Sequence, residues 1–269
     1  MLSSAFGLQR MIKLRLIVGL LIIGPASCAQ AGRTGNFDNS SYLPAAEVTD
    51  ALLQHHIKQV DSISHTQSLA SHFASIYTAS MKNIGVQLTR MDSDAQIFIK
   101  KFEISFISYF LDAAFEFEQK GRLPHDAIWN CYFSNSNAQP WQLTLIGVNA
   151  HINGDIWKGL VKNFTEQEIK RYKGNLLSFQ SSISKAFEPF FGDLMDQSAY
   201  LRFINGFTKG SAKLYGEWLV YNWRLRQINL AMLYFQDQEK FRKKLSAISR
   251  KRQKIDRVIL KKEKSVRNR

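Results

Sequence analysis

The sequence predicts an all-α protein: a single bundle of about six or seven helices with a long basic C-terminal helix. Apolar residues recur at three- and four-residue spacing from residue 44 to the C-terminus, which is the period of an amphipathic helix. No segment alternates polar and apolar residues for long, so strands are not needed to account for the chain. Because the chain has only 5 prolines and no clear linker, we expect its body to form one domain.

The composition of the 269 residues is that of a globular protein, with 45% hydrophobic and 22% charged residues. These fractions exclude wholesale disorder. The 2 cysteines are too few for a disulfide scaffold or for a cysteine-rich zinc or iron–sulfur cluster.

The first element is predicted to be an export signal. Arg10, Lys13 and Arg15 precede an unbroken apolar run over residues 16–26. That run is shorter than the roughly 20 residues needed to span a bilayer. A basic segment, a short apolar run and small residues after it are typical of a secretory signal peptide. We therefore expect residues 1–31 to direct export, to the periplasm or as a membrane-attached lipoprotein.

Two routes of processing stay open. Ala29-Gln-Ala31 fits ordinary signal cleavage between residues 31 and 32. Ala26-Ser-Cys28 resembles a bacterial lipoprotein box, in which cleavage between residues 27 and 28 leaves an acylated Cys28 at the N-terminus. Pro25 departs from that pattern, because the box usually has an aliphatic residue there. The small, polar residues that follow, 32–43, are expected to form a tether.

The helical domain is predicted over residues 44–239. Pro44 suits the first turn of a helix, Asp92-Ser-Asp94 offers N-caps, and Gly121 with Pro124 ends a helix. The first three predicted helices are 44–62, 66–87 and 94–119. Residues 125–139 predict a short helix followed by a polar loop.

Three further helices complete the prediction. One begins at Pro140 and ends near residue 161. The capping box Thr165-Glu-Gln-Glu168 opens the next, which is predicted to end near residue 191. The last begins near Asp196 and is expected to continue from Ala212 as one long rod into the basic tail.

The most distinctive residues lie in the helix predicted for 140–161. A polar string, Asn149-Ala-His151-Ile-Asn153-Gly-Asp155, is embedded there among Leu, Ile, Val and Trp. It resembles the N-A-H-I-N-x-D-L signature of an uncharacterised bacterial all-helical family, a domain of unknown function. The resemblance extends over roughly residues 65–235, and it implies a helical fold but no activity.

On an α-helix, His151 and Asp155 lie one turn apart on one face, and Asn149 and Asn153 form a second such pair. The two pairs project from different sides of the helix, so we expect it to run through the centre of the bundle. A buried polar group costs on the order of 1–3 kcal/mol unless it is hydrogen-bonded. Partners for these four side chains are therefore expected.

One interpretation of the polar string is the site of a metal-dependent hydrolase. His151 and Asp155 can supply two ligands to zinc or another divalent ion, and their spacing is similar to a zinc-ligating stretch of phospholipase C and single-strand nuclease families. Further ligands would come from Asp112 and Glu116, a carboxylate pair one turn apart. The upstream histidines are also candidates: His55, His56, His72 and His125.

The other interpretations need no metal. In one, His151 and Asp155 belong to a structural core network with Arg224 or Arg226 as counterion, and the asparagine side chains bridge helices. In another, the polar centre binds a ligand or performs acid–base chemistry without a metal. Whether the protein is an enzyme, and on which substrate it would act, stays open.

The formal charge of +14 is concentrated at the two ends of the chain. Residues 240–269 hold 14 Lys and Arg against two acidic residues, whereas residues 32–239 are close to neutral. A folded nucleic-acid-binding face is thereby disfavoured. The tail predicts a basic amphipathic helix. It either lies on an anionic membrane surface, or is a solvated extension that packs on the body or a second copy or frays. Attachment through it would suit a non-catalytic cell-envelope protein.

Overall fold

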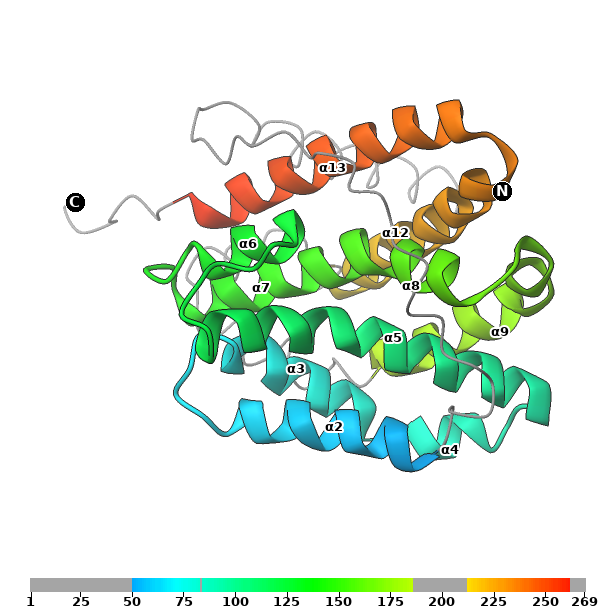
Figure 1. Cartoon of the computed structure of the whole chain (residues 1–269), viewed down its shortest axis with the longest axis horizontal. Coiled ribbons are helices and arrows are strands. Elements are labelled where there is room, and N and C mark those ends of the chain that lie inside the picture. The colour runs from blue at the N-terminus through cyan, green and yellow to red at the C-terminus, as the bar shows by residue number, and fades with distance from the viewer. Residues whose placement is uncertain (1–49, 83, 186–211, 262–269) are drawn as a thin grey trace, which may run out of the picture.

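The computed structural model describes residues 50–82, 84–185 and 212–261. These residues form a bundle of helices without strands, as predicted (Figure 1). In chain order the elements are α2 (Asp50–Ser64), α3 (Ser71–Met81), α4 (Ile84–Leu88), α5 (Ser93–Glu118), α6 (Ala127–Phe133), α7 (Pro140–Ala150), η3 (His151–Asp155), α8 (Ile156–Asn163), α9 (Glu166–Lys185), α12 (Ala212–Gln236) and α13 (Gln238–Leu260). The predicted export signal with Cys28, the tether and the helix start near Asp196 lie outside the described residues.

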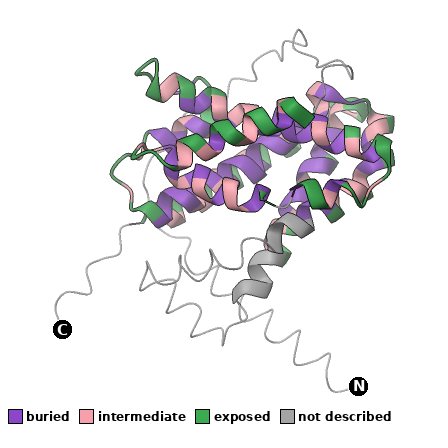
Figure 2. Cartoon of the chain, turned by 90° about the horizontal axis from the view of Figure 1, so that it is seen from below, coloured by how far each residue is buried: buried purple, intermediate pink, exposed green. Residues whose placement is uncertain are grey.

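The helix predicted for 94–119 is confirmed as α5. The Asp92 side chain caps it by accepting a hydrogen bond of 2.8 Å from the backbone N–H of Ala95. The phenylalanines of α5 form the core of the bundle, and Figure 2 shows how the buried positions gather between the helices. The fully or almost fully buried members are Phe98, Phe102, Phe106 and Phe110.

The single helix predicted for 66–87 is wrong, because the described chain divides it into α3 and α4. Residues 65–70 form turns in which side-chain hydroxyls bond backbone groups in addition to the backbone hydrogen bonds of the turns. Thr66 Oγ1 donates to the carbonyl of Ile63 at 2.8 Å and accepts from the N–H of Ser68 at 3.3 Å. Such local side-chain bonds compete with a helical ladder and delay its start.

The helix predicted from Pro140 is continuous through α7, η3 and α8, but its middle is a π-helical turn. A π turn bonds each N–H to the carbonyl five residues back, and it leaves wider gaps in the backbone ladder than an α turn. One such carbonyl, that of Asn153, accepts a hydrogen bond of 2.9 Å from Gln227 Nε2 on α12. A Cβ at Gly154 would lie 2.6 Å from Ile128 Cδ1, so only glycine allows α6 to approach this closely.

The predicted rod from Ala212 into the tail is also wrong. Helix α12 ends at Gln236, and extended backbone at Asp237 turns the chain back into α13. The Asp237 side chain caps α13 by accepting from the backbone N–H of Lys240 at 2.9 Å. Figure 1 shows α13 lying along one side of the bundle, where Phe241 and Ile248 are buried. None of the helices in the described ranges combines the length and apolar character that crossing a membrane requires.

Candidate functional site

The polar string occupies the π turn η3 and the end of α7, in the middle of the bundle. All four predicted polar side chains, Asn149, His151, Asn153 and Asp155, are buried. As the sequence predicts, they project from two sides of the helix. His151 and Asp155 face α5 and α6, whereas Asn149 and Asn153 connect to α13.

On the first side, Asp155 is the acceptor for three donors. Its Oδ2 lies 3.2 Å from His151 Nδ1 and accepts from Trp129 Nε1 at 2.9 Å. Its Oδ1 accepts from Lys158 Nζ at 3.1 Å. Because both oxygens already accept hydrogen bonds, the imidazole must donate through Nδ1, which leaves Nε2 with its lone pair.

Lys158 is a buried cation held between two carboxylates. Besides Asp155, its ammonium group bonds the Asp126 carboxylate, whose other oxygen caps α6. Burial lowers the pKa of Lys158, but the charges of Asp155 and Asp126 outweigh burial and raise it overall. The pKa of Asp126 falls, because the charge and hydrogen bond of Lys158 outweigh the effect of burial. The ammonium group therefore stays charged and neutralises this side of the turn.

Aromatic rings enclose the His151 side chain. The Phe106 ring is stacked on the imidazole at a centroid distance of 3.4 Å, and the Phe73 and Tyr77 rings meet it edge-on at 5.2 Å. Burial among these rings lowers the pKa of His151 despite the nearby Asp155 carboxylate, so the imidazole is neutral at pH 7. The ring is thus fixed in one orientation and one protonation state.

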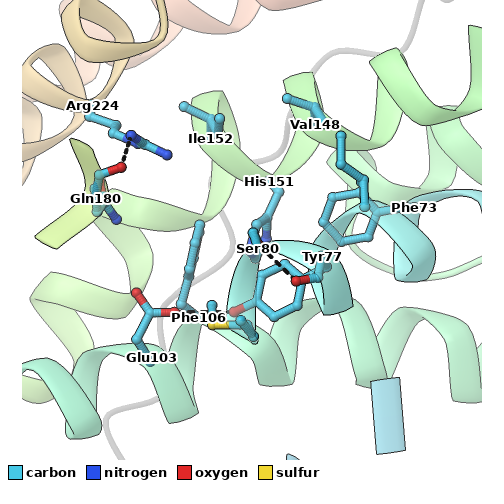
Figure 3. Close-up of a pocket in the computed structure, with 12 residues that line it drawn as sticks. Phe73, Tyr77, Ser80, Glu103, Phe106, Val148, His151, Ile152, Gln180 and Arg224 are labelled. Carbon is cyan, nitrogen blue, oxygen red and sulfur yellow. Dashed lines mark hydrogen bonds between the residues drawn. The ribbon is translucent and has the colours of Figure 1, made fainter. Parts of the chain in front are cut away.

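The Nε2 atom of His151 is buried and has no hydrogen-bond partner among the described residues. The His151 side chain lines a cavity of about 40 Å³, which is room for roughly three water molecules. Figure 3 shows side chains from three separate elements at this space: His151 from η3, Glu103 from α5 and Arg224 from α12. An unpartnered buried nitrogen on a side chain that lines a cavity is unusual in a native core.

Glu103 supplies a second polar group to the cavity wall. Its Oε2 accepts a hydrogen bond of 3.1 Å from the Tyr77 hydroxyl, while its buried Oε1 has no hydrogen-bond partner in the described part of the chain. Burial raises the pKa of Glu103 to about 8, against the opposing effects of Tyr77 and Arg224. At pH 7 this carboxyl is therefore mostly protonated, and it can donate as well as accept.

Arg224 adds a positive charge to the same cavity. The guanidinium group is buried, and its Nη1 donates to the backbone carbonyl of Gln180 at 2.6 Å. Burial lowers the pKa of Arg224 to about 10, so it remains a cation at neutral pH. Neutral His151, protonated Glu103 and cationic Arg224 together leave the cavity wall with a positive charge.

On the second side of the turn, the asparagine pair reaches α13. Asn153 Nδ2 donates to Asn149 Oδ1 at 2.8 Å, and Asn149 Nδ2 donates to Asp256 Oδ1 at 2.7 Å. Asp256 Oδ2 forms an ion pair of 2.9 Å with Arg252, and both of these side chains are buried. The C-terminal helix is thereby tied to the π turn by polar contacts as well as by apolar packing.

The other predicted site residues lie elsewhere. Asp112 is exposed on α5, and Glu116 bonds Arg122 at 2.7 Å and the backbone N–H of His125 at 2.7 Å. Neither of the predicted arginine counterions pairs with Asp155, because Lys158 takes that position. Arg224 lines the cavity instead, while half-buried Arg226 on α12 acts electrostatically on Lys251 of α13.

The donor set around Asp155 does not fit a divalent cation in this arrangement. Lys158 and Trp129 occupy the carboxylate oxygens that a metal would need, and the ammonium charge would repel it. No group of three or more His, Cys, Asp or Glu side chains within residues 50–82, 84–185 and 212–261 could hold a metal ion. Metal binding through His151 and Asp155 stays a prediction that elemental analysis can test.

Sequence reasoning missed several partners of the polar string and one residue of the cavity wall. Lys158, one turn after Asp155, had a local signal because a cation three residues from a buried acid is a common pair. Glu103 also had a signal, since it is the one acidic residue between Phe98 and Phe110, where α5 is rich in aromatic residues. Asp126 and Asp256 had none beyond their charge, because their roles depend on tertiary packing.

Comparisons with known proteins give a family and no activity. A family model described as "Family of unknown function (DUF5995)" matches residues 48–262. No curated protein and no solved structure matches the chain significantly. The function must therefore be inferred from the residues of the site.

Proposed function

Because the chain belongs to the DUF5995 family of unknown function, we propose its role from the cavity: it binds a small hydrogen-bonding molecule between His151 and Glu103 and can move a proton on it. The observation that carries this proposal is the buried, unpartnered Nε2 of His151, whose side chain lines the cavity. An oriented neutral imidazole with a free lone pair is the usual form of a general base. The alternative role, a non-catalytic envelope protein, rests on α13 and not on the cavity.

The chemistry follows from the contacts of each group. A ligand O–H or N–H donates to Nε2; if its proton transfers there, Asp155 stabilises the imidazolium that forms through its 3.2 Å contact with Nδ1. The negative charge left on the ligand lies beside cationic Arg224. Protonated Glu103 donates through Oε1 to an acceptor of the same ligand. The site thus favours a compact molecule with both a donor and an acceptor.

The size of the cavity limits which small molecules can be used to test binding. Room for about three water molecules admits a compound of about four non-hydrogen atoms. Acetamide carries a donor and an acceptor, whereas acetone has the same number of heavy atoms and no donor. For a ligand of about four non-hydrogen atoms, the binding free energy is at best about −6 kcal/mol, which corresponds to a Kd of about 0.05 mM. The titration should therefore extend to ligand concentrations well above this value.

The test is a titration followed by the imidazole nitrogen resonances of the ¹⁵N-labelled protein. Acetamide should shift His151 Nε2 in a saturable way, while acetone should leave it unchanged. His151→Phe keeps a ring stacked on Phe106 but removes Nε2, and it should abolish the acetamide-dependent gain in Tm. An Nε2 resonance that responds to neither probe, or equally to both, would overturn the proposal.

Export and membrane attachment are further proposals that the sequence alone supports. They rest on the basic and apolar pattern of residues 1–31 and on Cys28 in its lipoprotein-like context. Expression of the full chain with a Cys28→Ala control, followed by fractionation and mass spectrometry of the N-terminus, distinguishes the two processing routes. A protein that stays in the cytoplasm with residues 1–31 still attached would contradict both processing routes.

A further inference from the structure

Helix α13 is anchored to the body along its inner side. Phe241 and Ile248 are buried, and the ion pair between Arg252 and Asp256 is almost completely removed from solvent. The half-buried apolar side chains of the helix also pack against the core: Leu245, Ile255, Ile259 and Leu260. The apolar stripe that an amphipathic helix would insert into a bilayer is therefore already used within the protein.

The outer side of α13 is strongly basic. We define its basic face as the exposed cations from residue 244 to the C-cap: Lys244, Arg250, Lys251, Lys254, Arg257 and Lys261. The single acidic residue of the same stretch, Asp256, points inward and is bound by Arg252 and Asn149. No carboxylate is exposed between residues 244 and 261 of the described helix, so this face carries one sign of charge.

From this arrangement we propose that the basic face of α13 docks on an anionic phospholipid surface by electrostatic attraction, without insertion of apolar side chains. The 23 residues of α13 extend over about 34 Å at 1.5 Å per residue, so the cations form a straight row suited to a flat surface. Each Lys or Arg near such a surface contributes about 1 kcal/mol, equal to about fivefold in the partition coefficient. Because these contributions add up, several cations together can hold the protein on an anionic membrane.

A lipid surface fits this face better than duplex nucleic acid does. A recognition helix enters the major groove, whereas α13 lies flat against α7 and α12 and is attached to them along its length. The rest of the body is nearly neutral and gives no second basic patch to wrap a duplex. The predicted export of the chain is consistent with a membrane partner.

The test compares two variants of the full chain that lose the same charge. Lys251→Gln/Lys254→Gln/Arg257→Gln removes three cations from the basic face. Lys58→Gln/Lys82→Gln/Arg90→Gln removes three exposed cations near α2 and α4, on the opposite side of the bundle (Figure 1). Binding is measured by co-sedimentation with vesicles of phosphatidylglycerol and phosphatidylcholine, and with vesicles of phosphatidylcholine alone.

We expect the α13 variant to lose about 100-fold in partition to the anionic vesicles, and the control variant to stay within about threefold of wild type. Wild type should be released at about 0.5 M salt, where the Debye length is roughly 4 Å. Equal losses in both variants, or equal binding to the two kinds of vesicle, would overturn the proposal. So would tighter binding to duplex DNA than to anionic vesicles at the same salt concentration.

Discussion

Asn149 on α7 and Asp256 on α13 are joined side chain to side chain by a hydrogen bond of 2.7 Å, although 107 residues separate them in the chain. Asn149 also accepts from Asn153 in the π turn, so one asparagine links the C-terminal helix to the segment that carries His151. The position of α13 and the geometry of the cavity are therefore expected to depend on each other.

The buried ion pair of α13 can be tested by charge removal. Arg252→Met leaves the Asp256 carboxylate buried without its cation, and it should lower the free energy of unfolding by about 3–5 kcal/mol. The double variant Arg252→Met/Asp256→Leu removes both charges and should recover most of that loss. Urea denaturation at pH 7 measures both. Exposed Lys254→Met is the control, expected within about 0.5 kcal/mol of wild type.

Gly154→Ala should destabilise the protein by about 1–3 kcal/mol, because the new Cβ would lie 2.6 Å from Ile128 Cδ1. Gly174→Ala in α9 meets nothing within 4 Å and should be neutral or stabilising by up to about 1 kcal/mol. Adding Ile128→Ala to Gly154→Ala should make the loss smaller than the sum of the single effects. If thermal denaturation shows that the two single effects add up exactly in the double variant, the close approach of Gly154 to Ile128 is contradicted.

The pKa of Glu103 predicts a pH-dependent stability. Burial raises this pKa from 4.5 to about 8, so between these values the folded protein holds a proton that the unfolded chain has lost. The free energy of unfolding therefore falls as pH rises through this window, by up to about 1.4 kcal/mol per pH unit. Glu103→Gln cannot titrate, and it should match wild type at about pH 5 and exceed its stability at about pH 9. If the free energy of unfolding depends on pH in the same way in wild type and Glu103→Gln, this prediction is wrong.

Elemental analysis should find no stoichiometric divalent metal in the purified protein, because Lys158 already neutralises Asp155. Incubation with a chelator should leave Tm unchanged for the same reason. Lys158→Ala frees Asp155 Oδ1 and removes the ammonium charge, so added zinc should bind this variant more tightly than wild type. Stoichiometric zinc in wild type that His151→Ala removes would show the metal interpretation to be right.

The parts of the fold that depend on local chemistry were predictable. Asp92 and Thr165 have side chains that cap helices within three residues, and the structure contains both caps. The placing of His151 and Asp155 on one face was predictable for the same reason, since the two residues are one turn apart.

The break at Asp237 and the π turn were missed for different physical reasons. Asp237 is a strong N-cap residue, but apolar periodicity on both sides of it favoured a continuous rod. The π turn has no comparable local signal: Gln227, 74 residues away, bonds the carbonyl of Asn153. Trp129 and Asp256 likewise act through packing between distant segments, which spacing along one helix does not reveal.

The π turn also fixes the length of this segment. It accommodates one residue more than an α turn would, so the faces of α7 and α8 are offset relative to an uninterrupted helix. Deleting one residue between His151 and Asp155 would let the segment close as an α-helix and leave the following helix facing the same way, because the turn holds the extra residue. Deleting one residue from α7 or α8 would instead rotate everything after it by about 100° and turn buried Trp157 or Leu160 away from the core. The π turn is thus the place in this segment where the loss of one residue changes the packing least.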